Sequence, residues 1–229
     1  SFVAYRQLYQ EAQRTAAGLE AAGINPDCQR VLQIADLNDY FAVFWACVLR
    51  GVVPVTVAVP STYAAENSVA RKLFSTATLL GNPPILASTA ICGALAAADV
   101  GNGSPRRIVD IATLRGTTTH HPNISRRADD IAFIQLTSGS TGVPKCIPER
   151  HDRILNHITA SAFANRYSVN DRTLNWLTMD HVVPLLMFHI KDVTIGCSQW
   201  QLSTRVVLAD PLRWLDELAQ HRISHTWAP

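Results

Sequence analysis

Stretches typical of helices and of strands alternate along the first hundred residues. Apolar residues recur every three or four positions over 1–22, and Gly23 is a favourable helix end. The short runs between the helical stretches are rich in β-branched residues, which indicates buried strands. Such alternation favours an α/β fold in which a parallel sheet is flanked by helices. We predict helices at 1–22, 41–49, 64–80 and 91–98, and strands at 31–35, 52–59 and 85–87.

A polar stretch, 99–130, interrupts this pattern and is rich in glycine, proline and threonine. We interpret it as the connection between two α/β subdomains and place the boundary after residue 115, giving subdomains 1–115 and 116–229. The predicted strands in the remaining sequence are 108–111, 131–136, 174–177 and 223–228, and the predicted helices are 152–164 and 212–219.

Charge and cysteine content exclude several classes of protein. The formal net charge of +2 gives no reason to expect nucleic acid or an anionic membrane surface as a partner. No apolar run is long enough to span a bilayer. The five cysteines include no CxxC pair, so neither a disulfide framework nor a zinc site is indicated, and we expect a cytoplasmic protein with no protein-ligated metal. The start at Ser1 rather than Met suggests a piece of a longer polypeptide.

The segment 137–145 is the most informative part of the sequence, because it gathers hydroxyls, glycines and a lysine directly after a predicted strand. Glycines let backbone N–H groups approach an anion closely, and hydroxyls add further donors. Lys145 supplies a mobile positive charge suited to phosphate, and it is one of only three lysines in the chain. The residues that we predict to bind phosphate are Thr137, Ser138, Gly139, Ser140, Thr141, Gly142 and Lys145.

Two other interpretations of this segment are a flexible Ser/Gly linker and a Walker A loop. A linker seldom follows a buried strand or ends in Val-Pro-Lys. A Walker A loop needs Gly-Lys-Ser/Thr at the start of a helix. Here Pro144 precedes the lysine and Pro148 follows it, so no helix is expected to start at the loop.

The run 136–145 closely resembles the nucleotide-binding loop of the adenylate-forming (ANL) superfamily. This superfamily includes acyl-CoA synthetases, fatty acyl-AMP ligases and the adenylation domains of peptide synthetases. Residues 1–60 are similar to the family's opening elements, and 175–229 are closest to loading adenylation domains of hybrid polyketide–peptide synthases. The sequence departs from the family at Cys146, where glycine is usual, and at 149–151. The resemblance implies an incomplete N-terminal adenylate-forming domain that lacks the mobile C-terminal lid domain.

This resemblance implies chemistry in which a carboxylate attacks the α-phosphate of ATP and pyrophosphate leaves. Carboxylic acids are ionised at neutral pH, so no general base is required. The reaction instead needs alignment and neutralisation of phosphate charge, which the resemblance assigns to the loop, to Lys145 as a catalytic residue, and to Mg²⁺ on the phosphates. The family's magnesium-binding glutamate and its catalytic lid lysine would lie beyond residue 229, so we expect the 229 residues alone to be inactive.

A second candidate site follows the predicted strand at 174–177. Open α/β sheets bind ligands at the carboxyl ends of their strands, and Asp180 and His181 lie just beyond this end. In the resembling families an aromatic residue or histidine here is close to the carboxylate substrate, which makes His181 a candidate catalytic and substrate-binding residue. Asp180 is a candidate for the aspartate that grips a substrate amino group. The alternative is a helix-capping aspartate followed by a surface histidine.

The expected function is ATP-dependent activation of an aryl or short acyl acid as its acyl-adenylate. The acceptor would be the phosphopantetheine thiol of a carrier protein in polyketide or nonribosomal peptide biosynthesis. Two alternatives stay open, namely an acyl-CoA ligase and a non-catalytic structural remnant within a megasynthase. The presence of a carrier domain in the full polypeptide separates the first two, and ATP binding separates both from the remnant.

Overall fold

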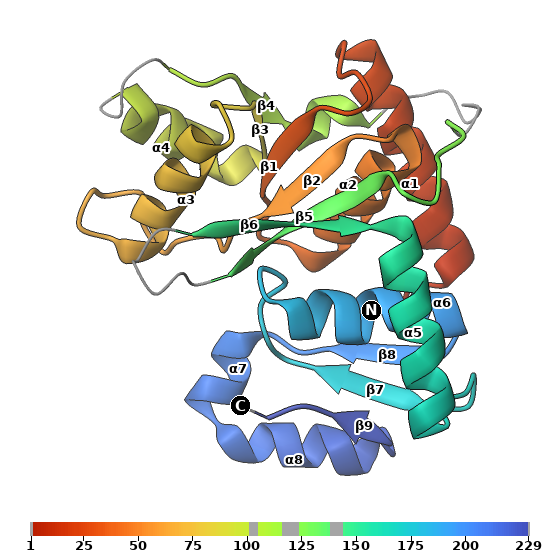
Figure 1. Ribbon diagram of the computed structural model, residues 1–229. Helices are drawn as coiled ribbons and strands as arrows, with labels where there is room; N and C mark the ends of the chain where they lie inside the picture. The colour runs from red at the N-terminus through yellow and green to blue at the C-terminus, as the bar shows by residue number, and fades with distance from the viewer. Residues whose placement is uncertain (1, 101–104, 116–123, 138–143, 229) are drawn as a thin grey trace. The chain divides into compact units, whose positions relative to one another are not determined.

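The computed structural model describes residues 2–100, 105–115, 124–137 and 144–228 (Figure 1). The chain divides into two compact units, Ser1–His151 and Asp152–Pro229. The sequence places the subdomain boundary after residue 115, whereas the contacts divide the chain after His151. This difference arises because the strand that follows the polar connection pairs with a strand of the first unit. Among the helices of the described residues, none has the length and apolar character needed to cross a membrane.

The described residues of the first unit form a six-stranded sheet with helices on both faces. Its order is β4-β3-β1-β2-β5-β6, and every neighbouring pair is parallel except β5 and β6. This arrangement confirms the α/β class with a mostly parallel sheet. The elements are α1 (Tyr5–Ala21), β1 (Gln29–Gln33), α2 (Leu37–Arg50), β2 (Val53–Thr56), α3 (Ser68–Leu79), β3 (Ile85–Ala87), α4 (Thr89–Val100), β4 (Ile108–Asp110), the 3₁₀ turn η1 (Ile111–Leu114), β5 (Ile131–Thr137) and β6 (Lys145–Arg150).

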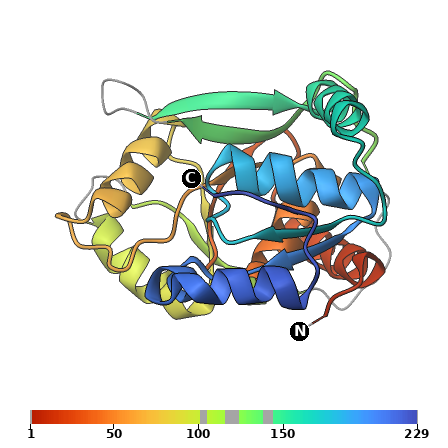
Figure 2. The same cartoon turned by 90° about the horizontal axis from the view of Figure 1, so that it is seen from below.

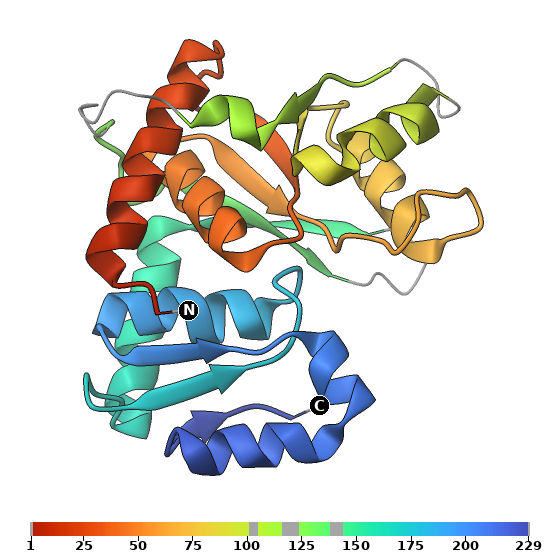
Figure 3. The same cartoon turned by 180° about the vertical axis from the view of Figure 1, so that it is seen from behind.

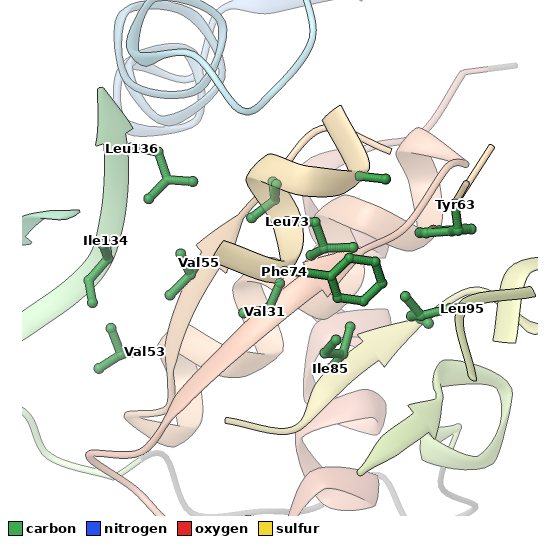
Figure 4. Packing of buried hydrophobic residues seen from close by; sticks show 13 residues of the cluster. Val31, Val53, Val55, Tyr63, Leu73, Phe74, Ile85, Leu95, Ile134 and Leu136 are labelled. Carbon is green, nitrogen blue, oxygen red and sulfur yellow. The ribbon is translucent and has the colours of Figure 1, made fainter. Parts of the chain in front are cut away.

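Side chains of this sheet alternate between two differently covered faces. Val55 and Ile134 belong to an apolar cluster that includes Leu73 of α3 and is completed by α4 (Figure 4). On the opposite face the ring of Phe133 packs edge-on against Phe44 of α2, with centroids 5.8 Å apart. Helices α1 and α2 pack against each other on that side of the unit (Figure 3). The strand β5 is therefore buried from both sides.

Local sequence signals determine where the helices of this unit begin and end. The Asp36 carboxylate caps α2 by accepting from the N–H groups of Asn38 and Asp39. Gly51 ends the same helix in the left-handed region with φ of 68°, where glycine is favoured. The sequence predicts α3 to begin at residue 64, but it begins at Ser68 because the side chain of Asn67 forms its N-cap.

The second unit contains a three-stranded parallel sheet of order β8-β7-β9. Helices α5 and α8 confirm the prediction, whereas β7 lies two residues earlier than expected and β9 is shorter. The helical segments η2, α6 and α7 and the strand β8 were not predicted. The elements are α5 (His151–Asn165), β7 (Arg172–Asn175), the π-helical segment η2 (Val183–Ile190), α6 (Lys191–Ile195), β8 (Ser198–Gln201), α7 (Thr204–Ala209), α8 (Pro211–Gln220) and β9 (His225–Thr226).

Candidate active site

The antiparallel strands β5 and β6 carry the two ends of the predicted phosphate loop, Thr137 and Lys145 (Figure 2). Thr137, the last residue of β5, pairs directly with Lys145, the first residue of β6. Both side chains are exposed. The structure therefore brings the two ends of the predicted loop together. The other predicted phosphate ligands, Ser138, Gly139, Ser140, Thr141 and Gly142, lie outside the described residues.

The hairpin is anchored by burial and by pairing within the sheet. Ile134 pairs with Val55 of the parallel neighbour β2, and Leu136 lies in the apolar cluster (Figure 4). The segment that follows the loop is a strand from Lys145 to Arg150, so no helix N-terminus adjoins the lysine. This confirms the expectation that no helix starts here and rules out the Walker A arrangement. Pro148 is tolerated in β6 because this is an edge strand.

Cys146, where the sequence departs from the adenylate-forming pattern, lies in apolar surroundings typical of a packing residue. Its side chain is half-buried on β6 and packs against the apolar cluster. This burial raises the pKa of the thiol above its ordinary value. A raised pKa keeps the sulfur protonated at neutral pH, whereas reactive cysteines need the thiolate. The geometry therefore favours packing over nucleophilic chemistry at this residue.

The second candidate segment, 176–181, follows the carboxyl end of β7 in the second unit. The side-chain amide of Asn175 bonds Leu177 twice, donating to its carbonyl at 3.0 Å and accepting from its N–H at 3.2 Å. The Thr204 hydroxyl donates to the carbonyl of Trp176 at 2.5 Å, and the indole N–H of Trp176 donates to Trp227 O at 3.1 Å. Hydrogen bonds from three directions thus fix the start of the segment.

Asp180 and His181 are adjacent but differ sharply in environment. The carboxylate of Asp180 is buried and accepts a hydrogen bond from the Thr178 hydroxyl at 2.6 Å. The His181 side chain is 64% exposed, and its Nε2 lies 3.9 Å from Asp180 Oδ2. The N-cap position of η2 is Val182 rather than Asp180. Asp180 is therefore not the N-cap residue of η2, whereas the exposed His181 agrees with the alternative of a surface histidine.

His189 is a buried residue of η2 for which the sequence predicts no role. Its side chain is 1% exposed, and Nδ1 lies 2.9 Å from the amide oxygen of Gln199. Burial lowers the pKa of His189 to about 4, although the hydrogen bond to Gln199 acts in the opposite direction. The imidazole is therefore neutral throughout the physiological range.

This lowered pKa makes the stability of the second unit pH-dependent. The unfolded chain binds the proton of His189 near pH 6.5, but the folded chain binds it only near pH 4, so acidification favours unfolding between these values. We expect the free energy of unfolding to fall by about 3 kcal/mol over this range from His189 alone. Urea unfolding of the parent and of His189→Phe at several pH values measures the difference. Parallel pH profiles for the two proteins would contradict the assignment.

The described residues offer no obvious alternative site. They contain no group of three His, Cys, Asp or Glu side chains that could hold a metal ion. A pocket of about 880 Å³ opens between α3 and α4, but alanines form much of its lining. The guanidinium of Arg71 at this pocket donates to the carbonyls of Ala65 and Glu66, so it is already engaged.

The sequence as a whole matches a known family. A family model described as AMP-binding enzyme covers residues 2–229. The chain belongs to the AMP-binding enzyme family. This membership confirms the resemblance to the adenylate-forming superfamily.

Comparison with individual relatives is consistent with this AMP-binding membership. The chain is 28% identical over 226 residues to the nonribosomal peptide synthetase acyN of Ascocoryne sarcoides, and the match covers 98% of the chain and 24% of acyN. It thus spans about a quarter of the length of the curated relatives that it matches.

Two solved structures resemble the AMP-binding chain along its whole length. The structure of McyG A-PCP complexed with phenylalanyl-adenylate has a TM-score of 0.96 and 31% identity, covering 100% of this chain and 36% of that one. The adenylation domain of a keto acid-selecting NRPS module, bound to keto acyl adenylate, has a TM-score of 0.86 and 32% identity, covering 98% and 41%. These matches confirm that the α/β architecture is that of the N-terminal adenylate-forming domain.

Proposed function

We propose that the full-length protein activates a carboxylic acid with ATP. The carboxylate oxygen attacks the α-phosphorus, the bond to the β-phosphate breaks, and acyl-adenylate and pyrophosphate form. The observation that carries this proposal is the β5–β6 hairpin, which holds exposed Thr137 opposite exposed Lys145 and whose strand β5 is buried from both sides. Family membership supports the same reaction.

The loop residues act by binding and charge neutralisation rather than by proton transfer. In this proposal the hydroxyls and backbone N–H groups of 137–142 hold the β- and γ-phosphates, and Lys145 offsets charge that builds up as pyrophosphate leaves. Magnesium bound to phosphate oxygens would offset further charge. We assign no residue of this chain to that metal.

Asp180 and His181 are proposed to contact the acid. The exposed imidazole of His181 is available to a substrate carboxylate, and the buried carboxylate of Asp180 would orient a donor group next to it. We propose an aryl or short acyl acid, following the resemblance to loading adenylation domains. The keto acyl-adenylate in one similar structure supports this class, whereas the phenylalanyl-adenylate in the other derives from an amino acid. We further propose a carrier-protein thiol as acceptor, since McyG was solved as an A-PCP unit.

Acid-dependent ATP–pyrophosphate exchange tests this proposal. The full-length protein would be assayed with aryl, short acyl, 2-keto and amino acids, beside the 229-residue chain alone. We expect exchange with one acid class by the full-length protein and none by the fragment. A folded full-length protein that binds no ATP and gives no exchange would contradict the proposal and favour the non-catalytic remnant.

Offering the activated acid a carrier protein or coenzyme A then tests the acceptor. We expect a thioester on the phosphopantetheine of the carrier, detected by the mass increase of the intact protein. Thioester formation on coenzyme A alone would contradict the carrier assignment and favour an acyl-CoA ligase.

A further inference from the structure

A row of polar side chains begins at the buried His189 and crosses strand β8. The amide oxygen of Gln199 lies 2.9 Å from His189 Nδ1 and also accepts from Gln201 Nε2 at 2.9 Å. An amide oxygen only accepts hydrogen bonds, so His189 Nδ1 carries the proton. Gln199 and Gln201 are two residues apart on one strand, which places both side chains on the same face of the sheet.

The row continues from β8 to β7 and ends at the backbone of the candidate site. Asn175 and Gln201 are register partners in the parallel pair, and Asn175 Nδ2 donates to Gln201 Oε1 at 2.9 Å. The same amide nitrogen donates to the carbonyl of Leu177, while Asn175 Oδ1 accepts from the Leu177 N–H. The amide row, defined as His189, Gln199, Gln201 and Asn175, thus terminates on residue 177.

Each member of the amide row fixes the orientation of the next. Because Gln201 turns its NH₂ group toward Gln199, its oxygen faces Asn175. Asn175 must then present its NH₂ group to Gln201, which leaves its own oxygen for the Leu177 N–H. Reversing any one amide would place two oxygens or two NH₂ groups against each other. Connected polar networks of this kind specify a single arrangement.

Leu177, whose backbone is held by Asn175, is three residues before Asp180 of the predicted acid-binding pair. Asn175 is 3% exposed, so its two bonds to Leu177 are protected from competing water. Beyond Leu177 the chain turns through Thr178, whose hydroxyl bonds the Asp180 carboxylate, to the exposed His181. A displacement of about 1 Å in such a group can cost about 100-fold in rate.

We propose that Asn175 is a positioning residue for acid recognition and that Gln201, Gln199 and His189 hold its amide in the required orientation. This inference rests on the proposed function, because it concerns the placement of Asp180 and His181 for the substrate acid. None of the four residues of the row belongs to the predicted phosphate loop, so we expect the effect to fall on the acid and not on the nucleotide.

Two variants of the full-length protein test the amide row against a matched control. Asn175→Ala removes both bonds to Leu177, and Gln201→Leu removes the support of Asn175 without touching the segment. Ser198→Ala changes an exposed residue of the same strand β8 and is the control. The measurements are the KM for the acid and the KM for ATP in pyrophosphate exchange, and hydrogen–deuterium exchange of the peptide covering 176–181.

We expect the KM for the acid to rise about 10-fold or more in Asn175→Ala and several-fold in Gln201→Leu, with the KM for ATP within twofold of the parent. Amide exchange of 176–181 should become faster in both variants and stay unchanged in Ser198→Ala. Equal changes in both KM values, or unchanged amide exchange at 176–181, would overturn the inference.

A parent protein without acid-dependent exchange would instead overturn the proposed function, and with it the role of the row in acid recognition. The hydrogen-exchange measurement would still decide whether the row holds the segment. Unchanged acid KM in an active, folded Asn175→Ala protein would overturn the inference while leaving the proposed function intact.

Discussion

Lys145→Ala in the full-length protein is expected to lower acid-dependent ATP–pyrophosphate exchange by about 10²–10³-fold. Loss of one preorganised group that stabilises developing charge typically has an effect of this size. Lys145 is exposed at the start of β6, so removing its side chain opens no cavity. The fold should therefore survive, and the loss of exchange should appear mainly in kcat. Steady-state exchange kinetics at saturating ATP measure it.

Lys72→Ala is the matched control for this prediction, because it removes the same charge from α3 in the same unit. We expect its exchange activity to stay within about twofold of the parent, because Lys72 is half-buried on α3 and lies outside the predicted phosphate loop. Equal losses in the two variants would point to a general effect of charge or stability and would contradict the role given to Lys145.

The second large effect is expected at the buried ion pair between Arg106 and Asp99. Their side chains are 2% and 1% exposed, and the guanidinium also donates to Thr78 Oγ1 at 2.8 Å and Asn82 Oδ1 at 3.0 Å. Arg106→Met would leave the Asp99 carboxylate buried without its countercharge. We expect the free energy of unfolding of the first unit to fall by about 3–5 kcal/mol, measured by urea denaturation.

Two further variants test whether the loss of stability comes from the uncompensated buried charge. Arg106→Met combined with Asp99→Leu removes both charges and should recover much of the loss, because no uncompensated charge remains. Arg14→Ala breaks the exposed pair with Glu11, whose side chains are 43% and 45% exposed, and should cost less than about 1 kcal/mol. A double variant less stable than Arg106→Met would contradict the account of the pair.

The first unit could be predicted from the sequence because its signals are local. Runs such as 52–59 are β-branched and lie between helices whose ends carry their own caps, as Asp36 and Gly51 do for α2. The phosphate loop is equally local, since nine consecutive residues contain the motif. Strand β6 was not predicted, because Pro148 disfavours a strand except at a sheet edge. The pairing of Thr137 with Lys145 in the β5–β6 hairpin was therefore not predicted either.

Much of the second unit could not be predicted, because its signals are not periodic. Residues 183–190 are almost uniformly apolar, and a π-helical segment buried on most sides leaves no three- or four-residue repeat. The amide row depends on the pairing of Asn175 with Gln201, which are 26 residues apart in sequence. The spacing of Gln199 and Gln201, two residues apart, is a sequence signal for strand β8 with polar side chains on one face.

Isotope transfer from the acid is the most direct test of the central claim, that a carboxylate oxygen attacks the α-phosphorus of ATP. The full-length protein would be given ATP, carrier protein and an acid labelled with ¹⁸O in its carboxylate, and the nucleotide products would be analysed by mass spectrometry. Thiol attack at the carbonyl carbon releases the bridging oxygen with AMP, so we predict AMP that carries one ¹⁸O atom. Label in inorganic phosphate together with ADP, or AMP without label, would contradict adenylation.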